Sequence, residues 1–213
     1  MSDTHRTYIP AAGHDWLLPL YDPLQKWLLG DAAYRALVDQ AHLQPGQRVL
    51  EIGCGTGNVV MLIKQLHARV DVVGLDPDPK ALERAQRKTR RAGLSIQLDR
   101  GFADALPYAA ESFDRVFSSL MFHHLTLDVK AGALREARRV LKPGGSLHVF
   151  DFGGAHVRGN GLRARLFHRH DLMKDNTGDR IPALMRDSGF ATAAEIADRS
   201  TLFGRVAYFR AQR

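Results

Sequence analysis

Two apolar runs joined by a glycine loop constrain the fold of this chain more than any other feature. Residues 49–60 read VLEIGCGTGNVV, with glycines at positions 53, 55 and 57, and residues 72–78 read VVGLDPD. The second apolar run ends at Asp76. This pattern predicts a buried strand, a tight glycine turn into a helix, and a second strand with a carboxylate at its carboxyl end.

The predicted turn has the physical properties of a nucleoside site. Glycines let the backbone turn tightly and approach a ligand closely, and the N-terminus of the following helix presents N–H groups to an anionic group. The carboxylate of Asp76 can accept hydrogen bonds from both hydroxyls of a ribose. A glycine loop alone is also common in strand–helix turns that bind nothing, so the loop and the carboxylate together predict a nucleoside-containing cofactor.

The glycine spacing distinguishes between two kinds of cofactor. Dinucleotide sites use G-x-G-x-x-G, which would require glycine where this chain has Asn58. The observed G-x-G-x-G, with Glu51 two residues before the first glycine, resembles the first motif of the class I S-adenosylmethionine-dependent methyltransferases. In that family the loop passes the methionine part of the cofactor. The resemblance therefore implies S-adenosyl-L-methionine as the cofactor.

Later motifs extend the resemblance over residues 48–151. They are the Asp104-Ala105 pair, the Phe113-Asp114 pair and the turn Leu141-Lys142-Pro143-Gly144-Gly145. The whole span resembles most the small-molecule methyltransferases of the ubiquinone/menaquinone-biosynthesis-like group (methyltransferase type 11), in which the Asp-Ala pair flanks the adenine. The cofactor-binding residues that the resemblance implies are Tyr21, Glu51, Gly53, Cys54, Gly55, Asn58, Asp76, Pro77, Asp104, Ala105, Ser119 and Leu120.

Strands and helices alternate along most of the chain. Hydrophobic periodicity predicts strands over 48–52, 70–75, 95–98, 113–118 and 146–150, and helices over 58–68, 79–93, 131–141 and 182–188. Such alternation predicts an α/β fold, a parallel sheet with helices on both faces. Two further strands, over 192–197 and 202–210, have no helix between them and predict an antiparallel pair at the sheet edge. The resemblance implies the complete fold, a Rossmann-like sheet of seven strands, mostly parallel with an antiparallel last strand.

Two segments do not belong to the alternating core. Residues 1–44 contain an apolar stripe and predict an N-terminal helical cap or substrate segment, and residues 45–213 form the predicted methyltransferase domain. Within that domain, the glycine-rich stretch 153–180 predicts a lid over the site, and a plain surface loop is an equal alternative. Weaker candidates for the acceptor pocket are His14, Tyr21, Asp151 and His156.

Composition excludes several classes of site and partner. Cys54 is the single cysteine, which excludes an internal disulfide and a cysteine-based zinc cluster, and no metal is predicted. No apolar stretch approaches the roughly 20 residues of a membrane span, and the first residues lack the apolar core of a signal peptide, so a cytoplasmic location is predicted. The net charge of +7 could attract nucleic acid, but the basic clusters lack interleaved aromatic residues, and solvated helix faces are favoured.

His123 and His124 are the candidate catalytic residues. They follow the predicted strand 113–118, within the sequence SSLMFHHL, and in the family this segment borders the transferred methyl group. A general base is needed only where the acceptor must lose a proton, and histidine has a suitable pKa near neutrality. Ring stacking on the cofactor and a structural hydrogen bond are the alternative roles.

Three functions are compatible with these residues. The leading hypothesis is an enzyme that transfers a methyl group to an oxygen, nitrogen or carbon nucleophile of a small molecule. The second is an RNA or protein methyltransferase that uses the basic surface, against which the Asn/Asp-Pro-Pro-Tyr/Phe motif is absent after residue 118. The third is a cofactor-binding protein without catalysis, or a nicotinamide oxidoreductase, and Asn58 argues against the latter.

Overall fold

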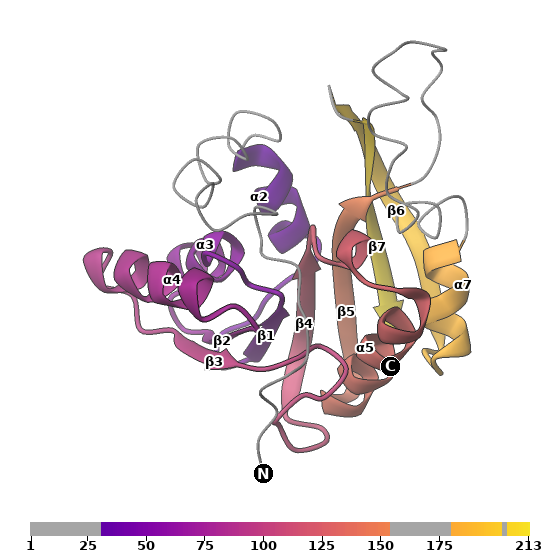
Figure 1. Cartoon of the computed structure of the whole chain (residues 1–213), viewed down its shortest axis with the longest axis horizontal. Helices are drawn as coiled ribbons and strands as arrows, with labels where there is room; N and C mark the ends of the chain where they lie inside the picture. The colour runs from indigo at the N-terminus through magenta and orange to yellow at the C-terminus, as the bar shows by residue number, and fades with distance from the viewer. Residues whose placement is uncertain (1–30, 154–179, 202–203) are drawn as a thin grey trace.

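A computed structural model describes residues 31–153, 180–201 and 204–213, and these residues form a seven-stranded sheet with helices on both faces (Figure 1). In chain order the elements are α2 (Asp31–Asp39), β1 (Arg48–Ile52), α3 (Asn58–Leu66), β2 (Asp71–Asp76), α4 (Pro79–Arg91), β3 (Gln97–Arg100), β4 (Phe113–Ser119), the short 3₁₀ helix η2 (Phe122–His124), α5 (Leu127–Val140), β5 (Leu141–Phe152), α7 (Arg180–Asp187), β6 (Thr192–Thr201) and β7 (Gly204–Gln212).

The strand order in the sheet is β3-β2-β1-β4-β5-β7-β6. Strands β1 to β5 pair in parallel, and β7 is antiparallel to both β5 and β6. The predicted fold, a mostly parallel seven-stranded sheet with an antiparallel last strand, is confirmed. The chain order reverses between β1 and β4, and ligands of open α/β sheets bind outside the carboxyl ends of the strands at such a reversal. The glycine loop that follows β1 lies at this point.

The turn from β2 into α4 forms as the sequence predicts. The side chain of Asp78 accepts a hydrogen bond from the Lys80 backbone N–H at 2.9 Å and caps the helix, and Pro79 occupies its first turn. Small side chains on α4 allow it to approach α3 closely, since a Cβ on Gly57 would lie 3.0 Å from the Cβ of Ala85. This packing holds the second βα unit against the first.

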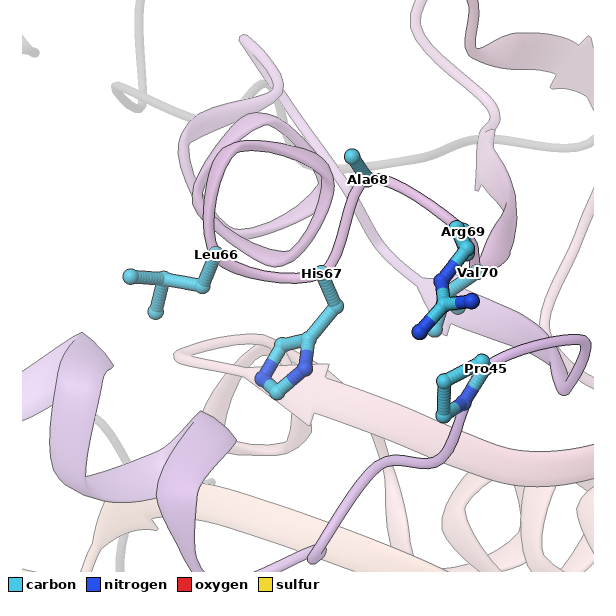
Figure 2. A pocket seen from close by; sticks show the side chains of 6 residues that line it. All are labelled: Pro45, Leu66, His67, Ala68, Arg69 and Val70. Carbon is cyan, nitrogen blue, oxygen red and sulfur yellow. The ribbon is translucent and has the colours of Figure 1, made fainter.

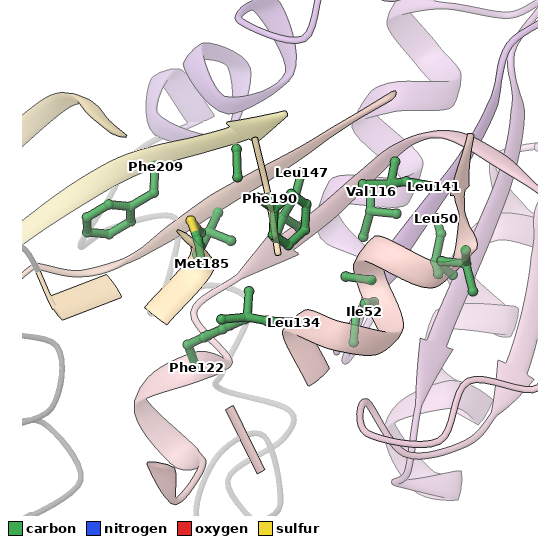
Figure 3. Packing of buried hydrophobic residues seen from close by; sticks show 14 of the residues in the cluster. Leu50, Ile52, Val116, Phe122, Leu134, Leu141, Leu147, Met185, Phe190 and Phe209 are labelled. Atoms are coloured by element: carbon green, nitrogen blue, oxygen red, sulfur yellow. The ribbon is translucent and has the colours of Figure 1, made fainter. Parts of the chain in front are cut away.

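Two apolar cores form, one on each face of the sheet. Helices α5 and α7 cover the first core, in which Leu134 and Met185 pack against Leu147 and Phe209 (Figure 3). Helices α2 and α3 cover the second core, where Leu37 and other buried residues contact the opposite face. Fully burying one such aliphatic or aromatic side chain contributes about 1.5–3 kcal/mol. With both faces covered, the central strands are buried on both sides, as the four consecutive buried residues 49–52 of β1 show.

The structure differs from the predicted elements mainly around α5. The helix begins at Leu127 rather than at residue 131. Its first two residues are exposed, with Leu127 52% accessible, and Lys130 is the first buried residue of the helix, so this turn does not add to the apolar stripe by which helices are recognised. Strand β5 then begins directly at Leu141, because residues 142–145 form a bulge between the pairs Phe113–Leu141 and Arg115–Ser146. The remaining elements agree with their predicted bounds to within a few residues.

Candidate active site

The glycine loop after β1 forms one wall of the candidate site. Gly53 and Gly55 have φ angles of +74° and +51°, in the left-handed region that glycine tolerates without strain. The N–H groups of Gly53 and Cys54 donate to the Leu75 carbonyl at 2.8 and 3.0 Å, which ties the loop to β2. A Cβ on Gly53 would lie 2.5 Å from Cγ of Met121, so no side chain fits there. Met121, which borders the loop here, is not among the site residues predicted from the sequence.

Asp76 lies at the carboxyl end of β2 beside this loop. Its Oδ2 accepts from the Gly55 N–H at 2.8 Å, its Oδ1 accepts from the Asp78 N–H at 2.9 Å, and the residue is 7% exposed. Burial raises the pKa of this carboxyl to about 6, against the lowering effect of the two hydrogen bonds. A carboxylate can accept about four hydrogen bonds, so Asp76 keeps acceptor capacity after these two. The residue thus fits the binding of ribose hydroxyls.

Glu51 holds the start of the glycine loop through hydrogen bonds to two neighbouring elements. Its Oε1 accepts from the Ser119 hydroxyl at 2.8 Å and its Oε2 accepts from the Val60 N–H at 3.1 Å. The residue is 1% exposed, and burial raises its pKa to about 8. Glu51 and Ser119 thereby join β1, β4 and the first turn of α3. A contact of either residue with the cofactor stays a prediction.

Three other predicted residues, Cys54, Asn58 and Pro77, join neighbouring elements around the site. A Cβ on Gly74 would lie 2.9 Å from Sγ of Cys54, so the thiol packs on β2, and burial raises its pKa well above the ordinary value. The thiol is therefore not a nucleophile. Asn58 Oδ1 accepts from Lys88 Nζ at 2.6 Å, and the Pro77 carbonyl accepts from the Arg100 Nε–H at 3.3 Å.

The Asp104-Ala105 turn follows β3 and packs against α5. Phe102 and Ala105 form an isolated β-bridge. A Cβ on Gly132 of α5 would lie 2.9 Å from the Cβ of Asp104, so the helix needs glycine at this contact. The Leu106 N–H donates to Glu136 Oε2 at 2.8 Å. Helix α5 therefore fixes the turn that the resemblance assigns to adenine binding.

Leu120 directs the chain out of β4 in an unfavourable backbone conformation. Its φ is +52°, a left-handed value that is an outlier for a bulky residue. The Leu120 N–H donates to the Phe150 carbonyl at 2.7 Å, and the side chain is 9% exposed within the second core. Such strain persists only where the surrounding structure enforces it, and it concentrates at functional sites.

His123, on η2, contacts a buried carboxylate at the end of β5. Its Nδ1 lies 2.8 Å from Oδ1 of Asp151, and its backbone N–H donates to Oδ2 at 3.4 Å. The Phe152 N–H also donates to Asp151 Oδ1, at 2.7 Å. The ring centroid of His124 lies 3.9 Å from that of His123, and the Phe152 ring meets His123 edge-on at 5.0 Å. The structure thus brings together His123, which the sequence predicts as catalytic, and Asp151, a weaker candidate.

The electrostatics of this pair determine which nitrogen carries the proton. Asp151 is fully buried, and burial alone would raise its pKa, but the charge and hydrogen bond of His123 and the Phe152 N–H lower it below its ordinary value. An ionised carboxylate only accepts hydrogen bonds, so Nδ1 of His123 donates. In the neutral ring, Nε2 then has the free lone pair that a general base needs.

Several sequence predictions are not tested by these contacts. Tyr21, His14 and His156 lie outside the described residues. Within the described ranges, no group of three or more His, Cys, Asp or Glu side chains is arranged to hold a metal ion. Among those same residues, no helix has the length and apolarity that crossing a membrane requires.

A small pocket of about 200 Å³ lies near the amino ends of strands β1 and β2 (Figure 2). It is lined by Pro45 and by residues 66–70, where α3 ends and β2 begins. Because β1 and β2 are parallel, their amino ends lie together, opposite the glycine loop. The pocket is therefore not part of the candidate active site.

Comparison with known proteins agrees with the geometry of the site. A family model described as a methyltransferase domain matches residues 49–145. A demethylmenaquinone methyltransferase of Deinococcus radiodurans is 32% identical over 83% of this chain and 82% of the relative. An O-methyltransferase of Aspergillus sclerotiorum is 31% identical over 68% of this chain and 55% of the relative.

Solved structures show the same fold at low sequence identity. A SAM-dependent methyltransferase from Aquifex aeolicus has a TM-score of 0.70 at 18% identity and covers 92% of this chain and 96% of its own. A phosphoethanolamine N-methyltransferase of Haemonchus contortus has a TM-score of 0.73 at 15% identity, over 91% of this chain and 57% of its own. These matches do not favour an oxidoreductase, a non-catalytic protein, or an RNA or protein methyltransferase. The chain belongs to the class I S-adenosylmethionine-dependent methyltransferases of the ubiquinone/menaquinone-like group, enzymes that methylate small molecules.

Proposed function

We propose that this methyltransferase acts on a small-molecule acceptor that must lose a proton, with His123 as the general base and Asp151 as the residue that orients it. The observation that carries the proposal is the 2.8 Å contact between Nδ1 of His123 and Oδ1 of the buried Asp151. A carboxylate in that position holds the ring in one tautomer and stabilises the imidazolium that forms when the base takes a proton. A hydroxyl acceptor meets this requirement.

The proposed cofactor contacts divide between three elements. Asp76 accepts from the ribose hydroxyls, Asp104 and Ala105 flank the adenine, and the loop with Gly53 and Gly55 passes the methionine part. The small space at Gly53 and the remaining acceptor capacity of Asp76 support this assignment. Further proposed cofactor contacts, implied by the family resemblance, are at Tyr21, Glu51, Cys54, Asn58, Pro77, Ser119 and Leu120.

The bound cofactor supplies an electrophilic methyl group on its sulfonium. The protein then has to align the acceptor, exclude water and remove one proton. The Nε2 atom of His123 takes the proton from the acceptor oxygen, and Asp151 balances the resulting charge. The rings of His124 and Phe152 lie beside that of His123, and stacking on flat rings at this place would favour an aromatic acceptor such as a phenol.

A screen of hydroxylated aromatic compounds, read out as release of S-adenosylhomocysteine, tests the substrate class. With an acceptor in hand, His123→Ala should lower kcat about 100-fold or more, because general base catalysis contributes about 10²–10⁴-fold. His67→Ala is the matched control, since His67 is the same type of residue and lines the pocket at the amino ends of the strands, away from the site. Unchanged kcat in His123→Ala, with cofactor binding intact in calorimetry, would show that His123 is not the base.

The remaining assignments are proposals of the same kind. Residues 1–44 serve as the cap or substrate segment of the domain over 45–213, and residues 153–180 serve as its lid. In the described part of the first segment, α2 packs on α3 and β5, which supports a role beside the domain. The enzyme works in the cytoplasm without a nucleic-acid partner. Cell fractionation tests the location, and RNA binding at two salt concentrations tests the partner, because phosphate-driven binding falls steeply with salt.

A further inference from the structure

One arginine holds the backbone at the point where the chain leaves β5. The Gly153 N–H donates to the Arg205 carbonyl at 3.0 Å, and the Gly153 carbonyl accepts from Nη1 of Arg205 at 2.8 Å. Just before this point, Asp151 pairs with Ala207 and Phe152 pairs with Val206 in the antiparallel β5–β7 ladder. Arg205 thus uses both its main chain and its side chain to fix the residue that follows the candidate base-orienting carboxylate.

The guanidinium is itself held by two carboxylates of β6. Nη1 and Nη2 of Arg205 donate to the two carboxylate oxygens of Glu195, and Nε donates to Oδ2 of Asp198 at 3.1 Å. The Arg205 side chain is 18% exposed, so the pairing is partly shielded from water. A planar guanidinium that binds a carboxylate with two nitrogens has a defined direction, and here that direction leaves Nη1 also facing Gly153.

A bulge in β6 places the two carboxylates on one face of the sheet. Residues three apart in a regular strand point to opposite faces. In β6, Glu195 pairs with Phe209 and Ala197 pairs with Tyr208, so Ile196 is an extra residue in the ladder. The bulge restores Glu195 and Asp198 to a common face. It also explains why Ile196, a large apolar residue, is 46% exposed.

Glycine is required at position 153 for the same contact. A Cβ there would lie 2.5 Å from the Cβ of Ala207 and 2.9 Å from Nη1 of Arg205. The guanidinium therefore occupies the space that a side chain would take. The bulge, the two carboxylates and the glycine all serve a single arrangement at the end of β5.

We infer that Arg205 is a positioning residue for the His123–Asp151 pair. This inference rests on the proposed role of His123 as the base. Arg205 acts through the backbone. Its guanidinium donates to Glu195, Asp198 and the Gly153 carbonyl, and so fixes the strand end that carries Asp151. The Phe152 N–H, which donates to Asp151 Oδ1 at 2.7 Å, belongs to the same fixed strand end.

The first test measures the His123–Asp151 contact by NMR and needs no methyl transfer. In the full chain labelled with ¹⁵N-histidine, the imidazole signals of His123, assigned with His123→Ala, report the Nδ1–H bond to Asp151. Arg205→Met should broaden or shift these signals, and Arg205→Lys should change them less, because lysine keeps the charge but not the planar fork. Arg210→Met, near the far end of β7, should leave them as in the wild type. Unchanged His123 signals in Arg205→Met would overturn the inference.

The second test measures methyl transfer. Arg205→Met should lower kcat about ten- to a hundredfold, as misplacement of a catalytic group does, while KM for S-adenosylmethionine stays within about twofold. The rise of the rate with pH should also move in Arg205→Met but not in Arg210→Met. If Arg205→Met does not fold, Glu195→Gln and Arg205→Lys take its place in both tests. A wild-type rate in His123→Ala would contradict the proposed function, whereas wild-type kcat and pH dependence in the folded Arg205 variants would contradict only this inference.

Discussion

Two buried carboxyl groups lie near the carboxyl ends of neighbouring parts of the sheet, and their pKa values are shifted in opposite directions. Glu51 lies beside Asp76 in the part of the site proposed to bind the cofactor (the cofactor half); it is 1% exposed, and its pKa is raised by burial to about 8. Asp151 lies beside His123 in the part proposed to bind the acceptor (the acceptor half); it is equally buried, yet its pKa is lowered. Their partners differ. Among the described residues, Glu51 accepts from the neutral Ser119 hydroxyl and the Val60 N–H, whereas Asp151 contacts the imidazole of His123.

The difference teaches that the partner, and not the depth of burial, decides which buried carboxyl is charged. Burial disfavours the charged form of both groups, and only a cationic or strongly donating neighbour reverses that effect. At neutral pH the Glu51 carboxyl is therefore largely protonated and serves as a support for the loop. Asp151 stays ionised, which is the form that can stabilise a protonated His123.

The largest expected effect is a loss of catalysis that comes from a change in the acceptor half alone. Asp151→Asn keeps the shape of the side chain but removes its charge, so kcat should fall about 100-fold or more, the range of general base catalysis. Glu51→Gln is the matched change in the cofactor half, and it should lower kcat only a few-fold, because Glu51 is already neutral. Equal losses in the two variants, measured by S-adenosylhomocysteine release, would remove the distinction between the two carboxyl groups.

A smaller effect is expected on cofactor affinity, from a change in the cofactor half alone. Asp76→Ala should weaken S-adenosylmethionine binding at least tenfold, because it removes hydrogen bonds to a charged group worth about 1.5–3 kcal/mol each. Asp71→Ala, at the exposed amino end of the same strand, should leave the affinity unchanged. Calorimetry measures both. Wild-type affinity in Asp76→Ala would mean that the ribose is bound elsewhere.

The pKa of Glu51 predicts a dependence of stability on pH. A carboxyl whose pKa is raised from 4.5 to about 8 contributes its full stability below pH 4.5, and that contribution is lost as the pH rises toward 8. Each unit of pH within this window changes the free energy of unfolding by up to about 1.4 kcal/mol. Urea unfolding between pH 5 and pH 8 should show this loss in the wild type and a flatter curve in Glu51→Gln. A curve of equal slope in the variant would assign the loss to another group.

The lowered pKa of His148 predicts that stability falls as the pH becomes acid, the opposite of the Glu51 dependence. The residue is fully buried, its Nε2 lies 2.9 Å from the Ser146 hydroxyl, and burial lowers its pKa to about 3. Its contribution is therefore complete above pH 6.5 and is lost as the pH falls toward 3. His148→Phe, which keeps the ring beside Phe117, should be less stable at pH 7 but lose less stability between pH 6 and pH 4.5. This effect is the smallest, since the Glu51 contribution rises over the same interval and offsets it.

The parts of the molecule that the sequence predicts are those encoded by neighbouring residues. The unit from β1 through the loop to β2 follows from apolar runs and glycines, and the cap of α4 follows from Asp78 and Pro79. The first turn of α5 and the bulge of residues 142–145 are less visible in the sequence, because neither adds to an apolar pattern.

The contacts of the candidate site depend on the register of distant strands. The edge rule for parallel sheets places both His123 and Asp151 at carboxyl ends of strands, but their 2.8 Å contact depends on how β4 pairs with β5. In the same way, a glutamate before a glycine loop is equally compatible with binding a ligand and with supporting the loop. The bonds to Ser119 and Val60 show that Glu51 supports the loop, and its contact with the cofactor stays a prediction.

The insertion of β7 between β5 and β6 has a consequence for the order of folding. The β1–β2–β3 half pairs strands that follow one another along the chain, whereas the strand that carries Asp151 acquires its second neighbour only when β7 is available. Contacts between distant parts of a chain form more slowly than local ones. During synthesis we therefore expect a cofactor-binding surface to form first and the base-orienting strand end to become rigid later. A nascent chain would in that case be able to bind the methyl donor before it is able to use it.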